Sequence, residues 1–490
     1  MDEMTQAIVV EKPGPDDRIY DRYLGAFLGA AIADALGWIT EFRKSKKELE
    51  GLGVERVEKF LTWEKPTGGR FHTYRDFVSQ GEYSDDTQLT LCTARSLEPD
   101  GTFNPDYFER ELTAWLDYAR GAGAAITAGA RNLSTGSRAK WNDNFYTSRG
   151  RGRRRGYVEA GGNGAAMRVM PHGLANRQDP IRTAEGVWQN AITTHGHPRA
   201  IVGALAIAEA ARVLASADTR TLTPRQFVSH ISEFVESIEV PSHQGWGEWV
   251  RKWQAESHSP FADLLDQTKL EMVSMLKLAA DTRIPLDRAM EQLGCFKPAT
   301  KGSGTACVAA ALGAFIREPL DYARQVLHLV NLLGIDTDTI GSMYGALVGL
   351  RIGSTRIPDI WSTRMQDYDY FLDVADVVTQ IGVRKAKQNY LRVDTPMVKS
   401  REHNLVELAK RRTVSKGQRV LHELLGPGWV QAVHSSSVKS GGLMLLADVA
   451  FDTGQSARFK SFKSPEARSG RGREGPTRSG PNPGGQGQLL

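Results

Sequence analysis

The sequence of 490 residues contains little cysteine and no long apolar run. Its cysteines, Cys92, Cys295 and Cys307, are odd in number and lack a C-x-x-C spacing. This argues against a disulfide framework and against a thiolate zinc site, and it fits a reducing compartment. The longest apolar stretches, such as GTACVAAALGAFI, fall short of the roughly 18 residues that a membrane-spanning helix needs. We therefore expect neither a secreted disulfide-rich protein nor a membrane protein.

The chain also carries almost no excess of charge. A net charge of +5 is small for this length and does not by itself indicate nucleic-acid or membrane binding. The first residues, MDEMTQAIVVEKPGPDD, are acidic and contain proline and glycine, unlike a secretory signal peptide. Hydrophobic residues make up 40% and charged residues 24%, as in an ordinary globular protein. These features predict a soluble, cytoplasmic protein.

Strand-like alternation is scarce over most of the chain, and helical periodicity dominates. Apolar residues recur at three- and four-residue spacings in segments such as PDYFERELTAWLDYAR and HPRAIVGALAIAEAARVLASA. This pattern predicts an all-α catalytic domain over residues 18–382, preceded by a flexible arm over residues 1–17.

The pattern changes after about residue 383. A charged helix at REHNLVELAKRR is followed by LHELLGPGWVQAV, and GLMLLADVAFDTGQSARFKSF predicts two strands around Thr453, Gly454 and Gln455. We predict a C-terminal α+β extension over residues 383–463, built from a helix and a hairpin. From residue 464 onward, 11 of 27 residues are Gly or Pro, which predicts a disordered basic tail over residues 464–490.

Two helical segments carry small residues at every fourth position, which places them on one face of each helix. Each interior glycine destabilises a helix by about 1 kcal/mol relative to alanine, so an offset such as close backbone approach is required. Dense core packing alone is one explanation; antiparallel packing of the two ridges would also bring Glu41 beside Asp336 and Asp338. The ridges consist of Gly25, Gly29, Ala33 and Gly37, and of Gly341, Gly345, Gly349 and Gly353.

Two acidic pairs stand at helix starts. YSDDTQLTLCTARSL offers Ser84 as an N-cap with Asp85 and Asp86 in the first turn, and DTDT (336–339) also precedes a helix. Either pair alone fits helix capping, because acids in the first turn stabilise a helix by a few tenths of a kcal/mol. Converging carboxylates, however, would repel one another unless a cation neutralised them. Carboxylate and hydroxyl oxygens suit Mg²⁺ or Mn²⁺, which could orient a nucleophilic water.

A glycine-rich turn and a histidine pair complete the set of candidate motifs. EAGGNGAAMRVMPHGL places Gly161, Gly162, Asn163 and Gly164 ahead of a helix, where free amides could hold a phosphate, although a plain loop fits equally well. TTHGHPRA contains His195 and His197. A histidine here either hydrogen-bonds groups of its own loop or hydrogen-bonds a ribose or phosphate oxygen of a ligand.

Taken in order, six motifs resemble those of the ADP-ribosylglycohydrolase family. They are GAFLGAAIADALGWITEF, YSDDTQ, GNGAAMRVMPHGL, THGHPRA, GSGTACVAAALGAF and NLLGIDTDTIGSMYGALVGL, and they cover roughly residues 20–355. The resemblance implies an all-α orthogonal helical bundle with two Mg²⁺ or Mn²⁺ ions at the base of an ADP-ribose cleft. It also implies hydrolysis of a glycosidic bond to ADP-ribose, with removal of mono-ADP-ribose from protein side chains, arginine first, as the expected activity.

The resemblance assigns roles to individual residues. The metal ligands it implies are Ser84, Asp85, Asp86, Asp336, Asp338 and Thr339. The catalytic residues it implies are Glu41, Asp85 and Asp86. The residues it implies for the distal ribose, the phosphates and the lining of the cleft are Gly162, Asn163, Gly164, Met167 and His195.

The chain departs from the family pattern at several positions. Ser84 replaces a threonine, Ala33 replaces the glycine of G-D-A, and Ile335 replaces the second glycine of G-G-D-T-D-T. None of these changes removes an oxygen ligand. The basic loop at 138–155, with seven basic residues and one acid, and everything after about residue 383 lie outside the family pattern.

Other interpretations of the sequence remain open. A haloacid-dehalogenase-type phosphatase would need IDTDT to follow a buried strand, whereas ARQVLHLVNLLG has helical periodicity. A relative that binds ADP-ribose without catalysis would not need all four aspartates and Glu41. A nucleic-acid partner, or a nucleic-acid-linked or small-molecule ADP-ribose substrate, would use the basic loop at 138–155. That loop has few aromatic platforms for bases. An ADP-ribosylated protein is the expected partner.

Overall fold

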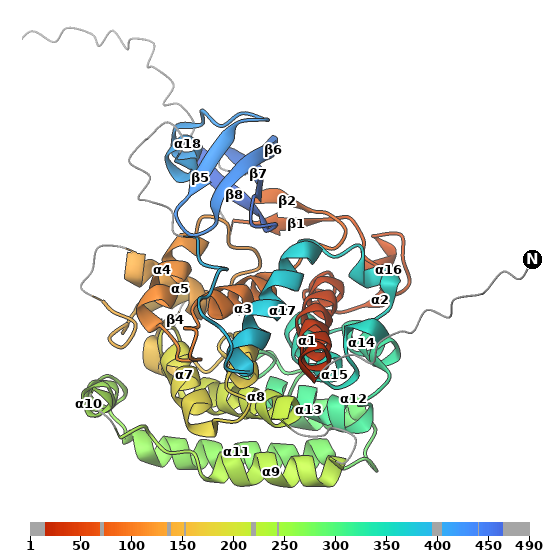
Figure 1. Ribbon diagram of the computed structural model, residues 1–490, viewed down its shortest axis with the longest axis vertical. Helices are drawn as coiled ribbons and strands as arrows, with labels where there is room; N and C mark the ends of the chain where they lie inside the picture. The colour runs from red at the N-terminus through yellow and green to blue at the C-terminus, as the bar shows by residue number, and fades with distance from the viewer. Residues whose placement is uncertain are drawn as a thin grey trace, which may run out of the picture.

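The computed structural model describes residues 15–68, 73–134, 139–150, 153–216, 222–242, 245–393, 404–439 and 441–463. Most of the predicted arm and the whole predicted tail lie outside these ranges. Within them the chain forms 18 α-helices, gathered into one body with a small sheet at one end (Figure 1). The predicted all-α bundle with a small C-terminal α+β extension is therefore confirmed.

The helices of the first half are α1 (Pro15–Trp38), α2 (Lys46–Glu50), α3 (Asp85–Arg95), α4 (Pro105–Trp115), α5 (Ala124–Ser134), α6 (Met170–Ala175), α7 (Pro180–Ile192), α8 (Pro198–Ser216) and α9 (Pro224–Glu236). Those of the second half are α10 (Trp246–Ser257), α11 (Phe261–Ala280), α12 (Leu286–Leu293), α13 (Gly304–Arg317), α14 (Tyr322–Val330), α15 (Thr337–Ile352), α16 (Asp359–Ser362), α17 (Tyr368–Gly382) and α18 (Leu405–Arg411). The strands are β1 (Trp63–Thr67), β2 (Tyr74–Val78), β3 (Thr147–Gly150), β4 (Arg153–Gly156), β5 (Arg419–His422), β6 (Gly426–Ser437), β7 (Leu443–Phe451) and β8 (Ser456–Lys463).

Helices α1 and α15 pack against each other through their small residues. A methyl group built on Gly25 or Gly29 would collide with the backbone of Gly349 or Gly345, and one on Gly37 would lie 2.6 Å from the carbonyl oxygen of Thr337. These pairs run in opposite directions along the two helices, so the predicted antiparallel approach of the glycine ridges is confirmed. Every residue from Tyr23 to Trp38 in α1 and from Thr337 to Leu350 in α15 is buried, which explains why these stretches show no polar face.

The other long helices wrap this central pair. Helix α17 also packs on α1, and α8 packs between α7 and α13. Helices α11 and α9 lie side by side along the edge of the body farthest from the sheet (Figure 1). No helix of the described ranges is both long enough and apolar enough to cross a membrane.

Two antiparallel hairpins, β1–β2 and β3–β4, interrupt the section that the sequence predicts as wholly helical. In β2 the inward-facing residues are Tyr74, Asp76 and Val78. The acid at the centre breaks the apolar alternation that would have indicated a strand. Strand β4 reads RRRG and has no apolar residue at all. Sequence periodicity therefore could not find either hairpin.

The C-terminal extension is a four-stranded antiparallel sheet in the order β5–β6–β7–β8, with α18 beside it. The predicted helix and the predicted hairpin around Thr453, Gly454 and Gln455 are both present, as α18 and as β7–β8. Strands β5 and β6 were not predicted. The last residue of β5, His422, pairs with the first residue of β6, Gly426. Strand β6 shifts its register against β7 between Val430 and Ala432, and this shift obscures the alternation of apolar and polar residues along it.

The sheet is anchored to the helical body by apolar and polar contacts. Its buried side chains belong to the same continuous core as those of the helices. The Arg458 guanidinium donates to Asp76 over 3.1 Å, and the Lys460 ammonium donates to the carbonyl oxygen of Ala119 over 2.6 Å. Strand β8 is thereby tied to β2 and to the loop that follows α4.

Replacement of Gly345 by leucine tests the glycine ridge. The side chain would be forced into the backbone of α1, so Gly345→Leu should lower the free energy of unfolding by about 1–3 kcal/mol or more. The matched control is Gly247→Leu in α10, where a side chain meets nothing within 4 Å and the helix gains propensity. Chemical denaturation of both variants measures the effect. Equal stability of the two would contradict the packing described here.

Candidate functional site

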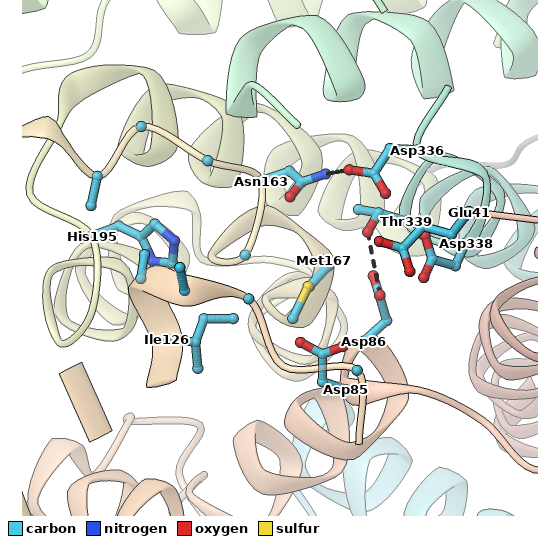
Figure 2. Close-up of a pocket in the computed structure, with 18 of the residues that line it drawn as sticks. Glu41, Asp85, Asp86, Ile126, Asn163, Met167, His195, Asp336, Asp338 and Thr339 are labelled. Carbon is cyan, nitrogen blue, oxygen red and sulfur yellow. Dashed lines mark hydrogen bonds between the residues drawn. The ribbon is translucent and has the colours of Figure 1, made fainter. Parts of the chain in front are cut away.

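A cavity of about 280 Å³ lies where the starts of α3 and α15 face the turn after α1 and the glycine-rich loop. Figure 2 shows acids gathered on one side of it, with His195 and Ile126 on the other and Met167 between them. The predicted residues that line this cavity are Glu41, Asp85, Asp86, Gly162, Asn163, Gly164, Met167, His195, Asp336, Asp338 and Thr339.

The carboxylates form two groups that share one member. Oxygens of Asp34, Asp86 and Asp338 all lie within 4.8 Å of one another, and so do those of Glu41, Asp336 and Asp338. Asp34, Asp86 and Asp338 are almost completely buried. Water therefore screens their mutual repulsion poorly, and the charge of the cluster must be compensated in another way.

Local helix chemistry sets the positions of these acids. Ser84 caps α3 and accepts a hydrogen bond from the Asp86 amide over 3.3 Å, and Asp336 is the N-cap residue of α15. Both helices direct their N-termini at the same space, and the partial positive charge of those termini favours acids there. Close packing of Gly37 on Asp338 then fixes the turn that carries Glu41 beside the start of α15.

Asp34 belongs to the cluster although the sequence analysis did not assign it. From α1, its carboxylate accepts hydrogen bonds from the Ser84 amide at 3.1 Å and from the Thr87 amide and hydroxyl at 3.1 and 2.6 Å. It thus holds the first turn of α3 against α1. The available signal was that Asp34 is the only charged residue between Tyr23 and Thr40. A lone acid on a buried helix needs a partner.

Several polar contacts orient the remaining acids. The side-chain amide of Asn163 donates to the Asp336 carboxylate over 2.9 Å, and the Thr339 hydroxyl donates to the Asp86 carboxylate over 3.3 Å (Figure 2). The other oxygen of Asp86, Oδ1, is buried and has no hydrogen-bond partner among the described residues. A buried carboxylate oxygen without a donor is costly unless a cation or a proton faces it.

Burial and mutual repulsion raise the pKa of every acid in the cluster. Desolvation, with the nearby Asp338, raises the pKa of Asp336 to about 8, and desolvation raises the pKa of Asp338 to about 6. Desolvation, with Asp34, raises the pKa of Asp85 to about 7, and desolvation also raises the pKa values of Glu41 and Asp86. Without a cation the cluster retains protons near neutral pH.

These observations fit a divalent cation. The donors are hard oxygens, one of them is orphaned, and the carboxylates are close enough to share an ion. Ser84, also predicted as a ligand, does not itself line the cavity. Its buried hydroxyl donates to Asp86 over 3.2 Å, beside the acids.

The glycine-rich loop crosses the opposite wall of the cavity. The backbone amide of Asn163 donates to the Gly302 carbonyl oxygen over 2.9 Å, and the backbone amide of Gly304 donates to the Gly161 carbonyl oxygen over 3.0 Å. These bonds hold the loop to the start of α13. A side chain on Gly164 would lie 2.7 Å from Ile126, so glycine keeps this wall open.

A chain of hydrogen bonds fixes the tautomer of His195. The guanidinium of Arg168, which can only donate, donates to the Thr194 hydroxyl over 2.8 Å. The Thr194 side chain is fully buried, and Nδ1 of His195, also 2.8 Å away, is the acceptor available to the hydroxyl proton among the described residues, so the hydroxyl donates to Nδ1. Nε2 therefore carries the ring proton on the side that lines the cavity. Burial and the Arg168 charge lower the pKa of His195 to about 3, so the ring stays a neutral donor.

The second histidine behaves as a loop residue. Nδ1 of His197 accepts from the Arg199 amide over 3.1 Å at the start of α8, and the ring does not line the cavity. The sequence left two alternatives open for this pair. His195 faces the cavity, and His197 hydrogen-bonds within its own loop.

Comparisons with known proteins agree on one family. The model of the ADP-ribosylglycohydrolase family matches residues 15–388. The ADP-ribosyl-[dinitrogen reductase] glycohydrolase of Rhodospirillum rubrum is 31% identical over 37% of this chain and 53% of its own length, about half of that relative. The ADP-ribosylhydrolase ARH3 of Danio rerio is 26% identical over 72% of this chain and 89% of its own. The ADP-ribosylarginine hydrolase Tri1 of Pseudomonas putida is 25% identical over 44% and 56%.

Metal-free protein should be less stable at high pH, because the folded state holds protons that the unfolded state releases. The pKa of Asp338 is about 6 in the folded state and about 4 when unfolded, so stability falls as pH rises through this interval. In EDTA, Asp338→Asn should therefore be more stable than wild type by roughly 1–3 kcal/mol at pH 8 and show little difference at pH 4. Denaturation at both pH values is the measurement. A variant less stable than wild type at pH 8 would contradict the repulsion.

Replacement of Thr194 by valine should release the His195 tautomer. In the wild type, ¹⁵N NMR should show His195 neutral from pH 8 to pH 5 with the proton on Nε2. Thr194→Val removes the bridging hydroxyl, so the Nδ1-protonated form should appear. Thr193→Val is the control, because that hydroxyl bonds only within its own helix, to the Gln189 carbonyl oxygen. A wild-type His195 protonated on Nδ1 would refute the hydrogen-bond chain, and a titration near pH 6 would refute the effect of burial and Arg168.

Proposed function

This chain belongs to the ADP-ribosylglycohydrolase family, and we propose that it hydrolyses the bond between the anomeric carbon of ADP-ribose and an acceptor in a metal-dependent reaction. The observation that carries the proposal is the convergence of five carboxylates, those of Glu41, Asp85, Asp86, Asp336 and Asp338, at one side of a cavity whose other side offers a glycine loop and a neutral histidine donor. Such a cavity suits a ligand with an anionic diphosphate at one end and a sugar at the other.

A pair of Mg²⁺ or Mn²⁺ ions would be held by the carboxylates that start α3 and α15. The proposed ligands are Asp85, Asp86, Asp336, Asp338 and Thr339, with Ser84 as their support. When bound, the ions supply positive charge that keeps the carboxylates ionised, holds ribose hydroxyls and favours ionisation of water. Asp34 lies on the α1 side of the same group and keeps α3 in place.

Glu41 is placed to handle the proton of the reaction. Its carboxylate lies with those of Asp336 and Asp338, and its backbone carbonyl is held by the Lys301 ammonium over 2.6 Å. Glu41, with Asp85 and Asp86, would accept the proton of a water as its oxygen bonds to the anomeric carbon. The bond from that carbon to the acceptor breaks, the acceptor leaves with a proton, and the carboxylates stabilise positive charge on the sugar.

The remainder of ADP-ribose would lie along the glycine loop. Gly162, Asn163 and Gly164 would face the distal ribose and the phosphates, and Met167 would pack against the ligand between the two sides. His195 would donate its Nε2 proton to a phosphate or ribose oxygen. Because its pKa is about 3, this donor would keep the same form over the working pH range.

Arginine in a mono-ADP-ribosylated protein is our first candidate for the acceptor. One of the similar proteins is named as an ADP-ribosylarginine hydrolase, which supports this choice. Serine-linked conjugates and nucleic-acid-linked or small-molecule ADP-ribose are the alternatives. The acid cluster would serve the same bond-breaking step for each of them, so only substrates can separate them.

The proposal is tested by release of ADP-ribose from arginine-, serine- and nucleic-acid-linked conjugates in Mg²⁺, Mn²⁺ or EDTA. We expect release from the arginine conjugate with either ion and none in EDTA. Asp338→Asn should lower turnover by about 100-fold or more, because it removes a charge from the site. Asp266→Asn, at an exposed surface pair with Lys269, is the control. Full turnover in EDTA after exhaustive dialysis would refute the mechanism.

A further inference from the structure

A second cavity, of about 700 Å³, adjoins the acid cluster and shares Gly121 with the first. It is enclosed by the end of α1 and the turn after it, the β1–β2 hairpin, the loop after α4 and strand β8. The residues that matter for its chemistry are Trp38, Phe42, Trp63, Lys65 and Lys460.

The two cavities meet at a thin partition. Glu41 lines the first and its neighbour Phe42 lines the second. Gly121 has a positive φ of 83°, and a side chain there would lie 2.7 Å from Oδ1 of Asp85 and 3.2 Å from Nε1 of Trp38. That indole N–H is buried and has no hydrogen-bond partner among the described residues. A molecule in the second cavity therefore lies next to the reacting acids.

Two cations of the second cavity, Lys65 and Arg43, form no ion pair among the described residues. The Lys65 ammonium lies 4.7 Å from the centre of the Trp38 ring and 4.4 Å from that of Phe42, and it has no hydrogen-bond acceptor in the described part of the chain. Arg43 lies over Trp63 at 5.3 Å. The charges of Glu41 and Asp85 act on Lys65 across the partition, and that of Glu48 acts on Arg43, but neither cation forms an ion pair with them among the described residues.

The acids of this cavity, in contrast, are engaged. Asp76 accepts from Arg458 over 3.1 Å, and Glu64 accepts from Arg75 over 2.7 Å. Glu48 accepts from the backbone amide of Lys44 over 2.9 Å. The acids of the cavity thus accept hydrogen bonds whereas the side chains of Lys65 and Arg43 donate none among the described residues, which favours an anionic occupant over a cationic one.

The aromatic walls argue against a nucleic-acid base as that occupant. The Trp38 ring already carries Lys65 and, at 5.2 Å, Arg120, and Arg43 covers Trp63. Stacking of a base would have to displace these cations, whereas a carboxylate would bind to them where they are. An acidic side chain of a protein acceptor therefore fits the second cavity better than a nucleotide does.

We propose that the second cavity binds the acceptor side of the conjugate and selects proteins with an Asp or Glu next to the ADP-ribosylated residue. This inference rests on the proposed function. If ADP-ribose extends from the glycine loop to the acids, the acceptor leaves on the side of Glu41 and Phe42, where this cavity begins. Lys65 and Arg43 would then pair with the neighbouring carboxylate.

The C-terminal extension completes this acceptor site. Strand β8 places Lys460 in the wall, with its ammonium bonded to the Ala119 carbonyl oxygen two residues before Gly121. Arg458 of the same strand holds Asp76 of the β1–β2 hairpin. Residues 404–463 lie beyond the region that the family model matches, so this wall belongs to the chain's own addition.

The test uses two peptides that each carry one ADP-ribosylated arginine and differ only in the next residue, Glu or Gln. Wild-type protein should cleave the Glu peptide with a kcat/KM about three- to tenfold higher, and the ratio should fall in high salt. Lys65→Met should bring the ratio close to one. Because the ratio is the readout, a general loss of rate near Glu41 does not affect it.

Matched controls keep the test decisive. Arg56→Met, at an exposed pair with Glu58 outside the cavity, should preserve the ratio. Arg43→Gln supplies a second cavity variant with the same expected loss of preference if Lys65→Met does not fold. Equal cleavage of both peptides by wild type, or an unchanged ratio in a folded cavity variant, would overturn the acceptor site.

Two further arms separate the sources of failure. An ADP-ribosylated oligonucleotide cleaved faster than either peptide would assign the cavity to nucleic acid and overturn the inference. Free ADP-ribosylarginine, which has no neighbouring residue, should be cleaved with about the same kcat/KM as the Gln peptide. No release from this compound or from either peptide would instead refute the proposed function, on which the inference rests.

Discussion

The close approach of α1 and α15 is the constraint on which the rest of the structure depends. Glycine on both helices lets their backbones touch, with Gly37 of α1 against Asp338 of α15. This contact brings Asp34 and Glu41 beside the acids at the start of α15, which are far away in the sequence. Lost helix propensity at the glycines is thereby offset by packing, and the same contact gathers charges that would otherwise separate.

The gathered charges define what the site can do. Buried carboxylates within 4.8 Å of one another retain protons unless a cation replaces those protons, and one oxygen of Asp86 has no hydrogen-bond partner among the described residues. The neutral donor His195 and the glycine loop complement this side with groups suited to phosphate and sugar oxygens. The C-terminal sheet adds Lys460 to the wall of the second cavity, which lies across Glu41 and Phe42 from the acids.

Local sequence carries some of these features and not others. Four-residue glycine spacing predicts the α1–α15 contact, and the two acidic pairs predict their helix starts, because each signal lies within one segment. The β1–β2 hairpin escapes prediction because its buried centre is Asp76, which is satisfied by Arg458 from the far end of the chain. Asp34 and the second cavity depend likewise on partners remote in sequence, such as Thr87 and Lys460.

We propose that the acid cluster is a cation site that holds protons when no ion is bound. Calorimetric titration of Mn²⁺ into dialysed protein near pH 7, in buffers of different ionisation enthalpy, tests it most directly. We expect saturable binding with release of about one or more protons. Asp336 and Asp85 hold protons near pH 7, and the bound ion would displace them. Binding with no proton release, or no binding at millimolar Mn²⁺, would contradict it.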